Sequence, residues 1–150
     1  MVSVEKKTEF LDVIQENFLQ GFDKLMVEVK LYPNDWTIWI RERNISNSAG
    51  NLCFYLVNTF NYSFEVLSGV VVGKERKNAT QLSRTELMER IESTKVFIRE
   101  TFRSITDETL DQEFPLAYRD RQVKTSAYLI YLLAELHYSI GQINYHRRLI

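Results

Sequence analysis

The chain has 150 residues, of which 45% are hydrophobic and 13% are aromatic. These values are typical of one globular domain with its own core and exclude a disordered chain. The 19 Lys and Arg residues nearly balance the 20 Asp and Glu residues, and the formal net charge is −1. The basic surface that a nucleic-acid-binding protein needs is therefore missing. We expect a single domain over residues 1–150 that does not bind nucleic acid.

The cysteine count and the first residues of the chain indicate the cellular compartment of the protein. Cys53 is the only cysteine, which excludes an intrachain disulfide and a zinc site built from several thiolates. Residues 1–7 lack the apolar stretch of a signal peptide, and no apolar run approaches the length of a membrane span. These patterns predict a cytoplasmic protein without a membrane partner.

Two amphipathic helices are predicted in the first half of the chain. Apolar residues recur every three or four positions over residues 4–30, at Phe10, Ile14, Phe18, Phe22, Leu25 and Val29. Residues 33–35 (Pro-Asn-Asp) end this helix. The second helix begins near residues 46–48 (Ser-Asn-Ser), whose side-chain oxygens can cap it, and ends near Ser68 and Gly69. The β-branched residues 70–72 either pair briefly as a strand or, as we favour for so short a segment, anchor a loop.

Two further helices are predicted in the second half. Residues 83–86 (Ser-Arg-Thr-Glu) match a capping box and open the third helix. Its apolar positions are Leu87, Ile91, Val96, Ile98 and Phe102. A polar connection over residues 106–120, broken by Pro115, leads to the fourth helix over residues 122–148. Four long helices can bury their apolar stripes only against one another, so the sequence predicts an all-α four-helix bundle.

Four segments, in this order along the chain, resemble one known family. They are residues 47–52 (Asn-Ser-Ala-Gly-Asn-Leu) shortly after Trp39, residues 67–69 (Leu-Ser-Gly), residues 83–87 (Ser-Arg-Thr-Glu-Leu) and residues 140–148 (Ile-Gly-Gln-Ile-Asn-Tyr-His-Arg-Arg). Together they resemble the DinB-like (bacillithiol-transferase-type) four-helix bundles over nearly the whole chain. The resemblance implies a DinB-like fold, and it also implies a metal-dependent or thiol-dependent S-transferase or hydrolase activity.

The metal ligands of that family are missing here. Active members carry one histidine on the second helix and two on the fourth, which bind a divalent metal, commonly zinc or nickel. The resemblance places these three ligand positions at Tyr55, Glu135 and Ser139. Neutral tyrosine and serine oxygens are poor zinc or nickel ligands, and only one carboxylate remains. We therefore expect no metal, no cofactor and no metal-dependent transferase activity. An active S-transferase or hydrolase is the alternative.

The two histidines and the cysteine do not replace these ligands. His137 points about 200° around its helix from the two ligand positions beside it, and His146 lies about 10 Å further along the axis. We predict that both are surface or interface histidines. Cys53 lies about 200° from Tyr55 around the second helix, so we predict an inert packing residue rather than a reactive thiol.

Two polar stripes are expected to meet at the former metal position. Helical spacing aligns one set on the second helix (Asn51, Tyr55, Asn58, Tyr62) and another on the fourth (Tyr128, Tyr131, Glu135, Ser139, Gln142). The candidate pocket comprises Asn51, Tyr55, Glu135, Ser139 and Gln142. Either Tyr55 donates a hydrogen bond to Glu135 and the two form a polar plug, or the pocket binds a small polar ligand.

The sequence thus predicts a binding or stress-associated protein. The partners expected are a small-molecule ligand and a second copy of the chain, because the chain has more aromatic residues than one small core needs. A third alternative stays open, in which the partner chain supplies groups to the site across a dimer interface.

Overall fold

The computed structural model describes residues 9–70 and 82–150, and their regular structure is helical. Its elements are α1 (Glu9–Leu31), the 3₁₀ turn η1 (Thr37–Trp39), α2 (Ala49–Ser68), α3 (Arg84–Phe102), the short α4 (Asp107–Asp111) and α5 (Thr125–Leu149). No β-strand is present in the described ranges. The prediction of an all-α four-helix bundle is confirmed.

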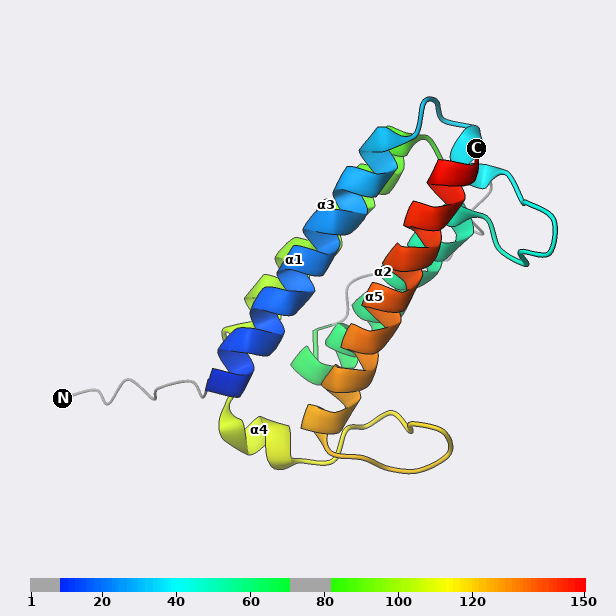
Figure 1. The fold of residues 1–150 in the computed structure, drawn as a ribbon. Coiled ribbons are helices and arrows are strands. Elements are labelled where there is room, and N and C mark those ends of the chain that lie inside the picture. Colours follow the sequence, from blue (N-terminus) through cyan, green and yellow to red (C-terminus); the bar gives the residue numbers. More distant parts are fainter. Residues whose placement is uncertain (1–8, 71–81) are drawn as a thin grey trace.

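The four long helices form a square bundle. Helix α1 packs against α3 and α5, and α2 packs against the same two helices from the opposite corner. Helices α1 and α5 run in one direction and α2 and α3 in the other (Figure 1). As a result, α5 has α1 along one side and α2 along the other, with one face left toward solvent.

Phenylalanine rings from three helices fill the core. They are Phe18, Phe22, Phe60, Phe64 and Phe102, each at most 1% exposed. Phe22 meets Phe60 edge to face, with ring centroids 5.0 Å apart at 80°, a favourable arrangement for two aromatic quadrupoles.

Two residues that we assigned to apolar stripes, Phe10 and Val96, are instead exposed. Val96 lies about 200° around α3 from the buried Thr94 and therefore faces solvent. Phe10 is in the first turn of α1, at the outer end of the bundle.

The predicted helix ends agree with the structure. The Ser48 hydroxyl accepts from the Asn51 N–H at 3.1 Å and caps α2. Ser83 and Glu86 form the predicted capping box of α3. Gly69 ends α2 with a φ of 73°, a left-handed conformation that favours glycine. Residues 4–8 of the first predicted helix and residues 71–72 of the β-branched segment lie outside the described ranges.

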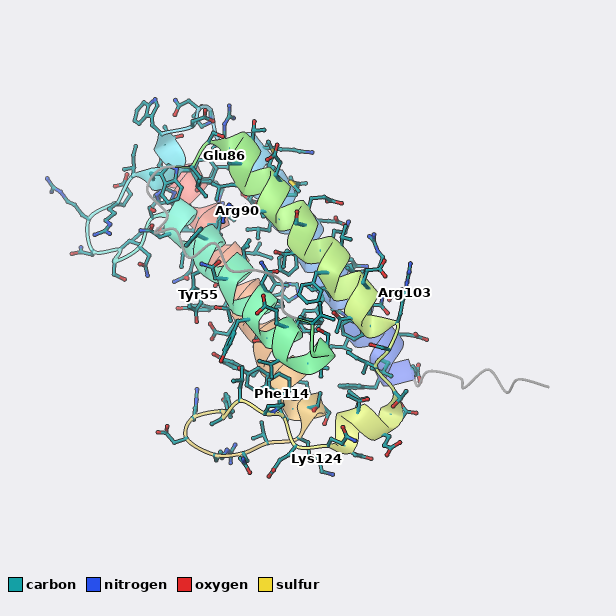
Figure 2. All side chains as sticks on the ribbon, turned by 180° about the vertical axis from the view of Figure 1, so that it is seen from behind. Tyr55, Glu86, Arg90, Arg103, Phe114 and Lys124 are labelled. Atoms are coloured by element: carbon teal, nitrogen blue, oxygen red, sulfur yellow. The ribbon has the colours of Figure 1, made fainter. Side chains whose placement is uncertain are left out.

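The predicted polar connection between the third and fourth long helices has more structure than expected. It contains α4, capped by Thr106, and a loop whose Phe114 is buried. The Phe114 ring stacks on Tyr128, with centroids 4.0 Å apart. Helix α5 begins at Thr125 rather than near residue 122, because the Thr125 N–H donates to the Gln112 carbonyl at 2.8 Å. Figure 2 shows Phe114 and Lys124 at this end of the bundle.

Candidate functional site

A cavity of about 210 Å³ lies between α2 and α5. It is lined by Asn47, Asn51, Leu52, Tyr55, Glu135, Tyr138, Ser139 and Gln142. The structure thus brings all five candidate pocket residues around one space. Sequence reasoning missed Asn47, Leu52 and Tyr138. Asn47 precedes the helix and therefore has no helical spacing. Tyr138 precedes Ser139 in the sequence but lies about 100° from it around the fourth helix, outside the predicted stripe.

Four residues of the two predicted stripes do not line this cavity. They are Asn58, Tyr62, Tyr128 and Tyr131. Tyr131 nevertheless interacts electrostatically with two lining residues: burial raises the pKa of its phenol, and Glu135 and Tyr55 raise it further. Asn61, the neighbour of Tyr62, points instead toward α3, where it accepts from the Thr94 hydroxyl at 3.0 Å.

The first turn of α2 forms one wall of the cavity, and Trp39 sets its position. A Cβ atom on Gly50 would lie 2.6 Å from carbons of the Trp39 ring, so only glycine permits this contact. The indole Nε1–H of Trp39 donates to the Leu82 carbonyl at 3.0 Å, which ties the start of α2 to the start of α3. Asn47 and Asn51 flank this turn and are positioned by it.

Among the residues that the structure describes, one charged side chain lines the cavity. It is Glu135, which is partly buried. Within the described part of the chain, Glu135 has no hydrogen-bond or ion-pair partner. The predicted hydrogen bond from Tyr55 to Glu135 is not formed. Tyr55 is 49% exposed, so water can reach its hydroxyl, and the plug prediction was wrong on this contact.

The residues at the three ligand positions do not fit a transition metal. Tyr55, Glu135 and Ser139 offer one phenol, one carboxylate and one hydroxyl, whereas zinc and nickel sites use imidazole or thiolate donors. Across residues 9–70 and 82–150, no group of three or more His, Cys, Asp or Glu side chains is placed to hold a metal ion.

A buried polar network joins the end of α1 to the end of α5. His146 is 2% exposed, so the surface prediction for this residue was wrong. Its Nε2 lies 2.7 Å from the Ile40 carbonyl and its Nδ1 lies 2.7 Å from the Tyr32 hydroxyl. Because a carbonyl can only accept, Nε2 of His146 donates to Ile40, and the Tyr32 hydroxyl also donates to the Ile143 carbonyl at 3.2 Å. Burial is the main cause that raises the pKa of Tyr32 above its ordinary value, so the phenol stays protonated as this donor.

Glu28 extends this network toward the surface. Its carboxylate accepts from Asn144 Nδ2 and from Arg147 Nε, each at 2.7 Å. Glu28 is 9% exposed, and these two donors compensate the burial of its charge. The sequence gave no periodic signal for this set, because the partners lie more than 100 residues apart.

His137 lies on a different groove. Together with α1 residues Lys24 and Val27 it lines a cavity of about 490 Å³ between α1 and α5. His137 itself is exposed, as predicted. Partial burial, and secondarily the Lys24 ammonium, lower the pKa of its imidazole. The nearby Asp23 is already paired with Lys95 of α3, and Glu28 with Arg147.

Cys53 is fully buried in the core. Burial raises the pKa of its thiol to about 12, so it is a neutral packing residue at physiological pH. A nucleophilic cysteine needs the opposite environment, with exposure and a lowered pKa. The structure agrees with the prediction of an inert thiol.

Comparison with known proteins supports the architecture. No protein-family model and no curated protein sequence matches the chain. Among solved structures, the chain is similar to the crystal structure of a DinB-like protein, YjoA, from Bacillus subtilis, with 17% sequence identity and a TM-score of 0.69. The match covers 90% of this chain and 89% of that one. In the described ranges no helix is long and apolar enough to cross a membrane. The chain therefore has the DinB-like fold that its sequence motifs predicted.

Proposed function

We propose that this protein binds a small organic cation in the cavity between α2 and α5, and that it has no metal-dependent transferase activity. One observation carries the proposal. Of the described residues that line the cavity, Glu135 alone is charged, and no described residue pairs with it. A partly buried carboxylate without a partner is unfavourable, and a cationic ligand would supply the missing charge.

The other lining residues suit the same ligand class. The rings of Tyr55 and Tyr138 border the cavity beside the carboxylate, and tyrosine faces attract organic cations. The amides of Asn51 and Gln142 can accept or donate hydrogen bonds to a polar group on the ligand. A volume of about 210 Å³ is below the roughly 300–1,000 Å³ of pockets for drug-sized ligands, so the ligand should be small.

The alternative activity lacks its chemical requirements. A metal-dependent S-transferase or hydrolase needs a Lewis acid to lower the pKa of a bound thiol or water, and the donor set at the three ligand positions does not fit such a metal. A thiol-dependent reaction of the protein itself would need an accessible thiolate, whereas Cys53 is buried. A stress-associated role, as the sequence suggested, would then operate through ligand binding.

Calorimetric titration with a matched pair of probes tests the proposal. Choline is the cationic probe, and 3,3-dimethyl-1-butanol is its uncharged carbon isostere. We expect choline to bind and the alcohol to bind at least tenfold more weakly, a difference of about 1.4 kcal/mol. Equal affinity for the two probes, or no binding of either, would refute the cation proposal.

Two charge-neutralising variants locate the site. Glu135→Gln keeps the side-chain shape and should weaken choline binding at least tenfold. Glu89→Gln changes an exposed glutamate on α3 and should leave the affinity unchanged, which controls for the net charge of the protein. If both variants weaken binding equally, the attraction is nonspecific and the assignment to Glu135 fails.

A further inference from the structure

The groove between α1 and α5 is the larger of the two cavities described above, with a volume of about 490 Å³. Helices α1 and α5 run side by side in the same direction (Figure 1). The groove follows them from His137 to Asn144, which is about 10 Å at 1.5 Å per residue. Among the described residues, none lines both this groove and the α2–α5 cavity. Its volume is within the roughly 300–1,000 Å³ of pockets that bind small organic molecules.

The middle of the groove is apolar and open. Val27 of α1 and Ile140 of α5 line it, and they are 53% and 8% exposed. A Cβ atom built on Gly141 would meet no atom within 4 Å, so the missing side chain leaves free space in this part of the groove. A hydrocarbon group on a ligand would fill that space and remove the apolar surface of Val27 from water, which is favourable.

Two nitrogen donors, Lys24 and His137, line the end of the groove nearest the start of α5. A Cβ atom on Gly21 would lie 3.7 Å from His137 Cε1, so the imidazole reaches across to α1, three residues before Lys24. Neither Lys24 nor His137 forms a hydrogen bond or ion pair with a described residue. An ammonium group and an imidazole N–H can donate to the two oxygens of one carboxylate.

The acidic side chains of the groove already have cationic partners. Asp23 is paired with Lys95 of α3. Glu28, at the other end of the groove, accepts from two α5 side chains at 2.7 Å each, one of them a guanidinium. Of the described residues that line the groove, Lys24 therefore carries the charge that is not compensated. The groove thus offers a free positive charge at one end and an apolar middle.

We infer that the α1–α5 groove is a binding site for a small carboxylate with a short hydrocarbon chain. The carboxylate group contacts Lys24 and His137, and the chain lies over Val27 and the open side of Gly141. Charge sets this direction, because the Glu28 carboxylate at the opposite end repels a second carboxylate. The inference does not depend on the cation proposed for the α2–α5 cavity.

Calorimetric titration with hexanoate and hexanamide gives the first test, because the two probes have nearly the same shape and differ in charge. We expect hexanoate to bind and hexanamide to bind at least about tenfold more weakly. Lys24→Gln should weaken hexanoate binding by a similar factor. Lys30→Gln removes an exposed charge of α1 outside the groove and should leave the affinity unchanged. No hexanoate binding, equal affinity for the two probes, or an equal loss in both variants would overturn the inference.

A groove-filling variant and a spectroscopic readout locate the site independently of Lys24. Gly141→Leu should abolish hexanoate binding without lowering the melting temperature, because its Cβ has free space and leucine favours helix over glycine. In the proton NMR spectrum, hexanoate should shift the ring signals of His137 and leave those of the buried His146 unchanged; His137→Gln, which removes one of the two sets, assigns them. Undiminished binding by Gly141→Leu, or no shift of His137, would refute this location.

Discussion

Removing the Tyr32 hydroxyl should destabilise the protein although it removes a single atom. In the wild type this hydroxyl contacts His146 Nδ1 at 2.7 Å and the Ile143 carbonyl at 3.2 Å, and all of these groups are buried. Tyr32→Phe deletes the buried hydrogen bond to the Ile143 carbonyl and leaves His146 Nδ1 without its partner. A net hydrogen bond contributes about 1 kcal/mol, and an unsatisfied buried polar group costs about 1–3 kcal/mol. We therefore expect a loss of about 2–3 kcal/mol.

Urea unfolding followed by circular dichroism measures this loss, and the slope against urea should not change. Tyr118→Phe is the control, because the ring of Tyr118 contacts two arginines and a tyrosine that need no hydroxyl. A double-mutant cycle with His146→Phe should give a coupling of about 1 kcal/mol or more. If Tyr32→Phe matches the control within about 0.5 kcal/mol, and the coupling is near zero, the network does not stabilise the fold.

Three further outcomes are expected. Burial raises the pKa of the Cys53 thiol from its ordinary value of 9.0 to about 12 in the folded chain. The contribution of the neutral thiol to the unfolding free energy is therefore intact below about pH 9 and is lost toward pH 12. The unfolding free energy of the wild type should therefore fall more steeply over this range than that of Cys53→Ala, by up to about 1.4 kcal/mol per pH unit. Gly50→Ala should lower the unfolding free energy by about 1–3 kcal/mol, because its methyl group would overlap the Trp39 ring; an unchanged melting curve would contradict this. Histidine at all three ligand positions should create tight zinc binding in calorimetry, whereas the native chain should retain no stoichiometric zinc or nickel after dialysis; a folded triple variant without zinc affinity would show that these positions do not converge.

Local patterns predicted the helices because each depends on nearby residues. The caps at Ser48 and Ser83 and the left-handed Gly69 act within one helical turn, so the sequence alone indicates them. Helix α4 was missed because its stabilising cap at Thr106 leads into only one turn of helix. The burial of Phe114 depends on a ring contact with Tyr128, which no local periodicity reveals.

The candidate pocket was predictable only in part. Helical spacing and the family resemblance together indicated the five pocket residues, and the structure places all of them around one cavity. The predicted Tyr55–Glu135 hydrogen bond was wrong, because helical spacing does not determine the directions of side chains. His146 was predicted to lie at the surface or an interface because its partners, Tyr32 and the Ile40 carbonyl, are more than 100 positions away.

The network at the end of α1 has a consequence for the order of events during synthesis. The Glu28 carboxylate, the Tyr32 hydroxyl and the Ile40 carbonyl find their buried partners among residues 143–147. Before that late segment has left the ribosome, Arg84 can already contact the Tyr32 carbonyl and Asp35, and Trp39 can donate to the Leu82 carbonyl. The Glu28 carboxylate, the Tyr32 hydroxyl and the Ile40 carbonyl must still bind water until then, so this part of the core is completed only when α5 docks.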